Sequence, residues 1–197
     1  RKIIMIPSES QAPEAVREAL GSVFQNIYAE GYPNPDTHTL TQSQILDYPL
    51  QLARYRRIGD ERYYKGVEYA DVIEALARRR AAEAYAANGV GPDDIWANVQ
   101  PLSGSPANSA IYAALVPVGA TVMGMDLLHG GHLTHGSPVN RSGKLYKIVS
   151  YGIDPQTERL NYETIEALAR EHKPKMIIAG YTSYPWMPDW ARFRQIA

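Results

Sequence analysis

The sequence contains no cysteine, no excess of either charge and no long apolar segment. The absence of cysteine from its 197 residues excludes disulfide bonds and thiolate metal sites, and it favours a reducing, cytoplasmic location. Twenty basic and twenty-one acidic side chains give a net charge of −1, so no surface for nucleic acid is indicated. The longest apolar runs, such as Met176 to Ala179, are far too short to cross a membrane.

The amino terminus has no recognisable secretory signal. Only four apolar residues stand between Arg1-Lys2 and Pro7, which is too few for the apolar core of a signal peptide. Because the chain begins without methionine, we expect it to be part of a longer one.

The second half of the chain alternates short apolar segments with amphipathic ones. This alternation predicts an α/β fold, a three-layer α/β/α arrangement around a mainly parallel sheet. Trp186, Trp190 and Phe193 are interpreted as core residues. The expected strands are Ile95 to Val99, Thr121 to Met125, Tyr146 to Val149 and Met176 to Ala179, and the expected helices are Ala107 to Val116, Tyr162 to His172 and a segment from Asp189 onward.

The first half of the chain is expected to be helical. A helix beginning at Pro13 carries one apolar stripe, interpreted as a face packed on a core or on another chain. The clearest helix runs from Glu68 to Asn88. Between them, Pro49 should kink or split the amphipathic segment Ser43 to Arg57, and the arginines there and at 78–80 are expected to face water. The stripe consists of Val16, Leu20, Val23, Phe24 and Ile27.

This pattern predicts three parts. Residues 1–33 form an N-terminal arm and helix, residues 34–62 an inserted surface excursion, and residues 63–197 the first part of a large α/β domain, incomplete at its carboxyl end.

Three small residues precede a helix in the centre of the chain. Ser103, Gly104 and Ser105 stand before Pro106, a residue favoured at the first position of a helix. Unpaired amides and the helix dipole at such an N-terminus attract anions. A phosphate is the expected ligand, although small residues at a helix start serve more often as caps.

A glycine-rich loop with three histidines follows the strand at 121–125. Ligand sites of open α/β sheets lie beyond the carboxyl ends of the strands, so this loop is a candidate site. His129, His132 and His135 could alternatively bind zinc, but no carboxylate lies close in sequence. We therefore expect no metal, and expect His129 and His135 to orient the loop through hydrogen bonds.

Six sequence motifs carry a resemblance to a known family. The chain resembles serine hydroxymethyltransferase, a pyridoxal-phosphate enzyme of the aspartate-aminotransferase superfamily, called fold type I. The similarity covers nearly the whole chain except 34–62. The motifs are YAEGYP at 28–33, RYYKGVEY at 62–69, NVQPLSGSPAN at 98–108, HGGHLTHGSPVN at 129–140, SGKLY at 142–146 and HKPKMIIAG at 172–180.

The resemblance implies how pyridoxal 5'-phosphate would be bound. Ser103, Gly104 and Ser105 would hold its phosphate, and His132 would stack on its pyridine ring. Thr182 stands where the family usually has a serine near the ring hydroxyl. Tyr28 would also reach the cofactor.

The resemblance also implies the substrate contacts. Glu30 matches the carboxylate beside the substrate hydroxyl, where it would transfer or position a proton. In a homodimer, Tyr28 and Glu30 would serve the neighbouring subunit. Ser8 would lie near the substrate carboxylate, although Ser10 replaces the asparagine of that motif. The remaining implied contacts are Tyr63 and Tyr64 in the site, and Leu127, Gly131 and Leu133 around the folate.

The implied activity is one-carbon transfer between serine, glycine and tetrahydrofolate. The cofactor needs a Schiff-base lysine, which the family has in a Thr-His-Lys run. None of the six lysines here, at 2, 65, 144, 147, 173 and 175, has that context. We therefore expect an N-terminal portion of the enzyme that is inactive alone. Two alternatives stay open: a threonine-aldolase-like lyase with the same cofactor, and a non-catalytic dimerisation fragment.

Overall fold

The computed structural model describes residues 9–58 and 61–197, which form two compact units. We call Gln11–Gln100 the helical unit, and the unit whose main part is Pro101–Ala197 the sheet unit. Each is described by itself below.

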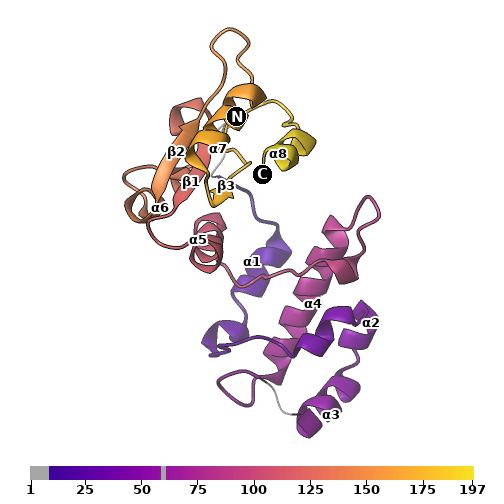
Figure 1. The fold of residues 1–197 in the computed structure, drawn as a ribbon. Coiled ribbons are helices and arrows are strands. Elements are labelled where there is room, and N and C mark those ends of the chain that lie inside the picture. Colours follow the sequence, from indigo (N-terminus) through magenta and orange to yellow (C-terminus); the bar gives the residue numbers. More distant parts are fainter. Residues whose placement is uncertain (1–8, 59–60) are drawn as a thin grey trace, which may run out of the picture. The chain divides into compact units, whose positions relative to one another are not determined.

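The helical unit is built around one long helix, α4 (Figure 1). Both α2 and α3 pack against it. Ile45, Tyr55, Val72 and Ala75 form the buried core, so part of the segment 34–62 is buried on α4. The elements are α1 (Glu14–Leu20), η1 (Val23–Asn26), η2 (Pro35–Thr39), α2 (Gln42–Ile45), α3 (Tyr48–Ile58), α4 (Glu68–Tyr85) and η3 (Pro92–Asp94).

The predicted effect of Pro49 is confirmed. The amphipathic segment splits into α2 and α3, and Pro49 is the second residue of α3, where a missing N–H costs nothing. The Asp47 carboxylate accepts a hydrogen bond from the amide of Leu50 at 3.1 Å and caps this helix. Thr41 and Gln44 form a capping box at the start of α2.

The apolar stripe of α1 and η1 lies exposed. Neither element contains a buried residue among those described. Leu20 is 60% exposed and Val23 71% exposed, so the stripe is not part of the core of its own unit.

The sheet unit contains a three-stranded parallel sheet in the order β2-β1-β3. In the register, Val122 of β1 pairs with Ile148 of β2 and with Met176 of β3. The prediction of a parallel sheet is confirmed. The elements are α5 (Gly104–Leu115), β1 (Thr121–Met125), η4 (Leu127–His129), η5 (Leu133–His135), α6 (Arg141–Leu145), β2 (Lys147–Tyr151), α7 (Tyr162–His172), β3 (Met176–Ile177) and α8 (Trp190–Ile196).

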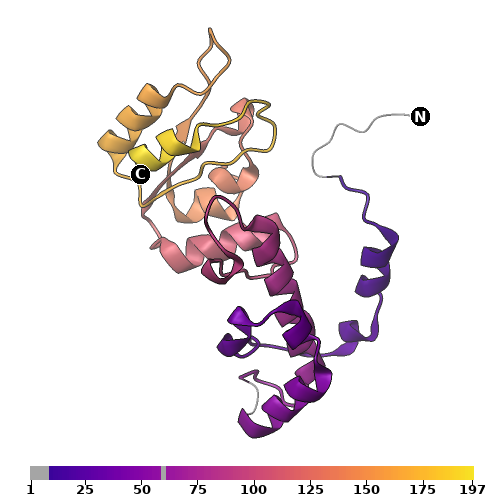
Figure 2. The ribbon, with the colours of Figure 1, turned by 90° about the vertical axis from the view of Figure 1, so that its right-hand side faces the viewer.

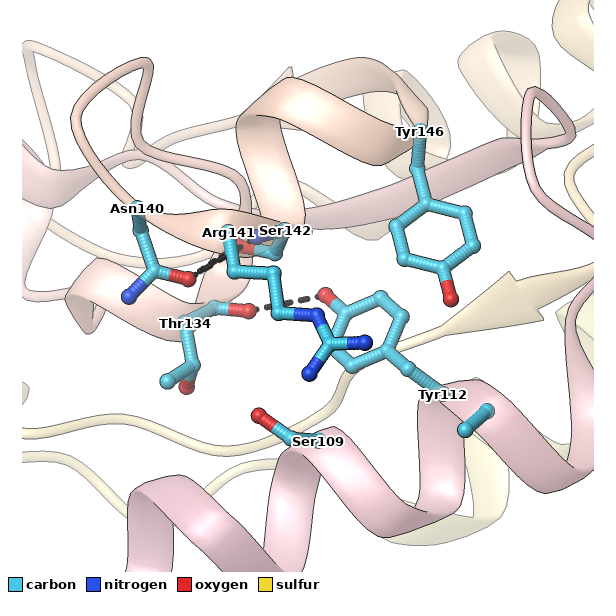
Figure 3. A pocket seen from close by; sticks show the side chains of 8 residues that line it. Ser109, Tyr112, Thr134, Asn140, Arg141, Ser142 and Tyr146 are labelled. Atoms are coloured by element: carbon cyan, nitrogen blue, oxygen red, sulfur yellow. Dashed lines mark hydrogen bonds between the residues drawn. The ribbon is translucent and has the colours of Figure 1, made fainter.

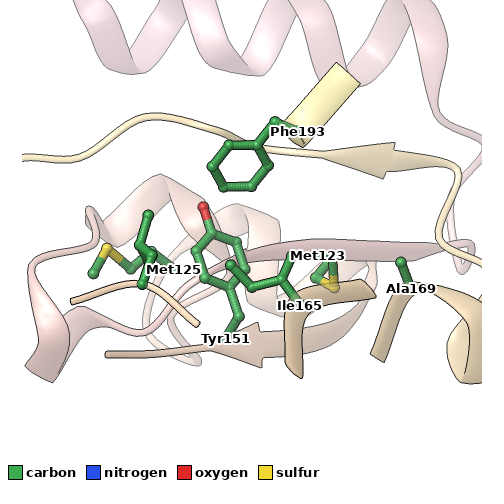
Figure 4. Packing of buried hydrophobic residues seen from close by; sticks show 7 residues of the cluster. Met123, Met125, Tyr151, Ile165, Ala169 and Phe193 are labelled. Carbon is green, nitrogen blue, oxygen red and sulfur yellow. The ribbon is translucent and has the colours of Figure 1, made fainter. Parts of the chain in front are cut away.

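Both faces of this sheet are covered. Met123 and Met125 of β1 face α7 and α8, where Phe193 packs beside Tyr151 (Figure 4). The neighbouring Val122 belongs to a second cluster, with Tyr112 of α5. Helices α7 and α8 lie side by side (Figure 2). Since successive strand residues point to opposite faces, β1 is buried on both sides, and the unit has the predicted α/β/α layers.

The predicted strand Ile95 to Val99 is wrong. This segment has no strand partner among the described residues and follows η3 as extended chain. Instead it folds back on α4, where the Nε of Arg78 donates to Ala97 O at 3.0 Å and Trp96 stacks on His38 with ring centroids 3.9 Å apart. Side-chain contacts thus take the place of the strand-to-strand hydrogen bonds that the alternating pattern of this segment predicted.

The predicted exposure of all three arginines at 78–80 is also wrong. The Arg79 side chain is 11% exposed, and its guanidinium pairs with Glu83 at 2.7 Å and with Asp93 at 2.5 Å. Arg78 is held by the folded-back segment, and Arg80 is exposed as expected.

Three details of the sheet unit also differ from expectation. Pro106 is the third helical residue of α5, not the first, which is still a position whose N–H would be unpaired. Strand β3 ends at Ile177, two residues early. Trp186 and Trp190 are 43% and 52% exposed, and only Phe193 of that cluster is in the core.

Candidate functional site

The loops that follow the three strands meet at the carboxyl edge of the sheet. The amide of Asp126, after β1, donates to Tyr151 O at the end of β2 at 2.8 Å. The amides of Thr182 and Ser183, after β3, donate to Gly130 O at 2.9 and 3.2 Å. These bonds join the loops into one surface at the edge where open α/β sheets bind ligands.

Gly131 lets the loop after β1 turn back against its own strand. A Cβ atom on Gly131 would lie 2.1 Å from Met125 O and 2.8 Å from Asp126 O, so no side chain fits there. Its neighbour Gly130 has φ of +107°, a conformation that favours glycine. Leu127 precedes Gly131 in the sequence and Leu133 follows it, and both side chains are exposed.

His132 is the N-cap of the short turn η5 and is fixed by its own loop. Its Nδ1 accepts from the amide of Thr134 at 3.2 Å and lies 2.8 Å from the Thr134 hydroxyl. The amide of His132 donates to Nδ1 of His135 at 3.2 Å. Burial, with a contribution from His132, lowers the pKa of His135 to about 4. The buried imidazole of His135 is therefore neutral near neutral pH.

Helix α5 is bonded directly to the His132 turn. The Nδ2 of Asn108 donates to the Thr134 hydroxyl at 2.8 Å, and the Tyr112 hydroxyl donates to Thr134 O at 2.8 Å. Asn108 stands one turn after the first residues of α5. Consequently the N-terminus of α5 and the imidazole of His132 belong to one connected structure.

The first residues of α5 leave their polar groups available. Ser103 is the N-cap, but its side chain makes no capping hydrogen bond. Gly104 and Ser105 have no intrahelical acceptor for their amides, and Pro106 has no N–H. All of these residues are exposed, and nothing lies within 4 Å of the position that a Cβ on Gly104 would take.

The other predicted site residues form a cluster in the helical unit. Tyr28 and Tyr64 stack with ring centroids 5.5 Å apart, and Tyr63 meets Tyr64 edge to face at 5.2 Å. The amide of Tyr63 donates to Glu30 O at 2.9 Å, and the Glu30 side chain is exposed. The structure brings these four residues together. Ser8 lies outside the described residues.

The three loop histidines have separate partners. Nδ1 of His129 accepts from the amide of Ile153 at 3.2 Å, whereas His132 and His135 are bonded within η5. No group of three His, Asp or Glu side chains suited to a metal occurs in the described part of the chain. In the same residues, no helix is long and apolar enough to cross a membrane.

Comparison with known proteins identifies the family. Residues 52–197 match the family model described as serine hydroxymethyltransferase. The chain belongs to the serine hydroxymethyltransferase family. The serine hydroxymethyltransferase of Methylococcus capsulatus is 45% identical over 195 residues, which are 99% of this chain and 39% of that protein. That of Hydrogenovibrio crunogenus is 47% identical over 195 residues, 99% of this chain and 38% of that protein.

The chain therefore spans about 39% of the length of these serine hydroxymethyltransferases. The family assignment makes it part of a transferase enzyme, and the three-layer sheet unit is consistent with a partial fold type I domain.

A buried arginine in this chain was missed by the sequence reasoning. The Arg62 guanidinium, whose side chain is 1% exposed, pairs with Asp71 and with Glu74 at 2.7 Å. The same group donates to Ala29 O and Gly31 O. It thus clamps the carbonyls on both sides of Glu30. The only signal in the sequence was an arginine beside the two tyrosines, with Asp71 and Glu74 one turn apart.

A small pocket beside η5 was also missed (Figure 3). It lies between α5 and α6, where the Tyr112 and Tyr146 rings stack 4.8 Å apart. The Arg141 side chain extends over it towards Ser109 (Figure 3). Burial raises the pKa of Tyr112 to about 12, so this hydroxyl stays protonated as a donor to the His132 turn.

Proposed function

We propose that this chain supplies part of a pyridoxal-phosphate-dependent site for serine/glycine hydroxymethyl transfer with tetrahydrofolate. The supporting observation is the 2.8 Å hydrogen bond from Asn108 of α5 to Thr134 of the His132 turn. It joins the two elements that would contact the phosphate and the ring of one cofactor molecule.

The residues present fit the phosphate. Gly104 and Ser105 offer two amides without an intrahelical acceptor, and Ser103 and Ser105 add exposed hydroxyls. Open space around Gly104 leaves room for a tetrahedral anion. The helix dipole favours negative charge at this end.

The residues present also fit an aromatic ring. His132 is half-buried and its imidazole is held through Nδ1, as a stacking partner should be. Thr182 is exposed next to Gly130 and would offer its hydroxyl to the ring oxygen. When bound, pyridoxal phosphate supplies an electron-accepting ring for bond cleavage at an amino-acid substrate.

Glu30 would act on the substrate hydroxyl. Its carboxylate is exposed while its backbone is fixed by Arg62 and by the Tyr63 amide, so it can hold or move a proton at one oxygen. Tyr28, Tyr63 and Tyr64 would line the same site, with Tyr28 and Glu30 serving the partner subunit of a cytoplasmic homodimer. Ser8 would bind the substrate carboxylate.

Leu127, Gly131 and Leu133 would hold the folate. The two leucines are 47% and 43% exposed, and they flank the glycine turn. Exposed apolar side chains beside a polar loop suit a flat ring system.

The chain alone should bind the cofactor without turning over substrate. No lysine in the sequence has the context of the cofactor-binding lysine, and the chain spans about 39% of its relatives' length.

The first test is a titration of the chain with pyridoxal phosphate, followed by circular dichroism of the cofactor band. Binding with an induced signal is expected, and it should weaken at least tenfold in Ser105→Asp, which sets a carboxylate against the phosphate. Ser109→Ala, further along α5, is the control. Absence of binding would contradict the proposal, as would an imine on one lysine that borohydride reduces and traps in equimolar yield.

The second test uses a complete enzyme that contains this chain. Tetrahydrofolate should stimulate exchange of the glycine α-proton. Retained cleavage of β-hydroxy amino acids without folate stimulation would point to the lyase alternative, and a stable dimer that never binds cofactor would point to a non-catalytic module.

A further inference from the structure

We propose that Thr134 and Asn108 are positioning residues that hold His132 as its Nε2–H tautomer. In this arrangement Nδ1 is an internal acceptor and Nε2–H is the only donor that the ring offers to a ligand. The consequence for catalysis rests on the proposed function, because it requires His132 to cover an aromatic cofactor. The tautomer itself does not.

The first observation is the backbone bond at Nδ1. The amide of Thr134 donates to His132 Nδ1 at 3.2 Å. An amide N–H can only donate, so this bond favours the form in which Nδ1 presents its lone pair. In a neutral imidazole the proton then resides on Nε2. At 3.2 Å the amide contact is the longer of the two contacts at Nδ1, the shorter being the Thr134 hydroxyl at 2.8 Å, so the backbone bond contributes to the preference without fixing it alone.

The second observation is the direction of the side-chain bonds. The Nδ2 of Asn108 donates to the Thr134 oxygen at 2.8 Å, and this oxygen lies 2.8 Å from Nδ1 of His132. With Nδ1 presenting its lone pair to the Thr134 amide, the Thr134 O–H donates to Nδ1 while its oxygen accepts from Asn108. The bonds run in one direction, from Asn108 through Thr134 to His132, and such chains reinforce one another.

The third observation is that the anchor is buried. Thr134 is 2% exposed, and the Tyr112 hydroxyl donates to its carbonyl at 2.8 Å. On the other side, His135 uses its Nδ1 to accept from the His132 amide. His132 is therefore held through both its backbone and its ring.

The fourth observation concerns the remaining ring nitrogen. Among the described residues, Nε2 of His132 has no hydrogen-bond partner. A ring fixed in this way presents its π-face and a single N–H donor. The ligand that suits it is an electron-poor aromatic ring with an oxygen acceptor near its edge.

The test is nitrogen NMR of the full 197-residue chain carrying ¹⁵N-histidine, at a pH where the ring is neutral. Protonated and unprotonated ring nitrogens have well-separated shifts, so the tautomer is read directly. His132 should show the Nε2–H form alone. Thr134→Val keeps the volume but removes the hydroxyl, so it should give a mixture of both tautomers. Thr134→Ser should restore the single form.

Asn108→Ala is the second variant, and it should shift the tautomer in the same direction by a smaller amount. Two controls lie in the same neighbourhood. Ser142→Ala removes a buried hydroxyl that bonds to Asn140 Oδ1 and Leu133 O but not to the His132 ring. Tyr112→Phe removes the bond to the Thr134 carbonyl and leaves the Thr134 hydroxyl in place. Both controls should leave the tautomer unchanged.

An Nδ1–H ring in the unmodified chain would overturn the proposal. So would an unchanged tautomer in a folded Thr134→Val chain or, if that variant does not fold, in Asn108→Ala. A chain that shows the Nε2–H form yet never binds pyridoxal phosphate would refute the proposed function and leave the positioning of His132 intact.

Discussion

The two groups of proposed site residues are held by opposite kinds of interaction. In the helical unit, one buried cation fixes the backbone around Glu30, since Arg62 contacts two carboxylates and two carbonyl oxygens. In the sheet unit, His132 is held by neutral hydrogen bonds and by a glycine turn without room for a side chain.

This difference determines how each group should fail. A buried ion network is sensitive to the loss of one partner, because the remaining charges stay in a poorly polarisable interior. A neutral network is sensitive to a steric change or to the addition of a proton. The predictions below test that contrast, from the largest expected effect to the smallest.

Arg62→Ala should cost about 3–5 kcal/mol of unfolding free energy, because it removes a buried guanidinium that pairs with Asp71 and Glu74. Urea unfolding of the purified chain measures this loss. Arg80→Ala is the matched control: Arg80 lies on α4, the helix of Asp71 and Glu74, is exposed and bonds to Gln42, so it should cost less than about 1 kcal/mol. Equal losses of unfolding free energy in the two variants would show that the buried ion network is no more sensitive than an exposed charge.

Acid should destabilise the sheet unit through His135. Its pKa is about 4 in the folded chain against an ordinary value of 6.5 for histidine, so the unfolded chain binds the proton more readily. Stability is therefore complete above pH 6.5 and falls as the pH drops towards 4. The loss should reach about 2–3 kcal/mol, since one pKa unit corresponds to about 1.4 kcal/mol and solvent screening reduces the total.

The measurement compares urea unfolding at pH 7 and pH 4.5 in the unmodified chain and in His135→Asn. The asparagine keeps an acceptor near the His132 amide but cannot take up the proton. An identical pH dependence in both chains would show that His135 does not carry the effect.

Gly131→Ala should cost about 1–3 kcal/mol, because the added methyl group would lie 2.1 Å from Met125 O and the loop must move. The control is Gly180→Ala, where nothing lies within 4 Å of the new atom. That variant should be neutral or stabilising by up to about 1 kcal/mol. Thermal unfolding of the two variants separates a steric effect from a general effect of alanine.

Arg159→Gln should have the smallest effect. Its guanidinium lies 4.0 Å from the centre of the exposed Trp186 ring, and such a contact contributes about 0.5–1 kcal/mol. Tryptophan fluorescence should shift in Arg159→Gln and stay unchanged in Arg170→Gln, whose side chain pairs with Glu166 instead. A loss as large as that of Arg62→Ala would mean that exposed charges also govern the sheet unit.

Sequence reasoning recovered the parts of the fold that have local signals. Thr121–Met125 and Tyr162–His172 have the predicted bounds, because an apolar strand and a helix capped by Asn161 depend on neighbouring residues. The segment 95–99 failed because alternation indicates a strand only where a partner strand exists.

The candidate site was predictable to a lesser degree. Its motif residues could be matched to a family, but the groups that hold them could not. Arg62 lies 33 residues from Ala29 in the sequence, and the hydrophobic periodicity of the chain does not predict that contact. Asn108 and Thr134 are 26 residues apart, so the bond between them forms only once α5 and η5 are packed together.

Helix α1 has a further consequence for experiments on this chain. Its seven residues are too few to remain helical in water on local hydrogen bonds alone, and none of them is buried. Its amide protons should therefore exchange with solvent far sooner than those of α4, whose buried Val72 and Ala75 anchor it. Slow exchange in α1 would be direct evidence that another surface shields its valine and leucine side chains.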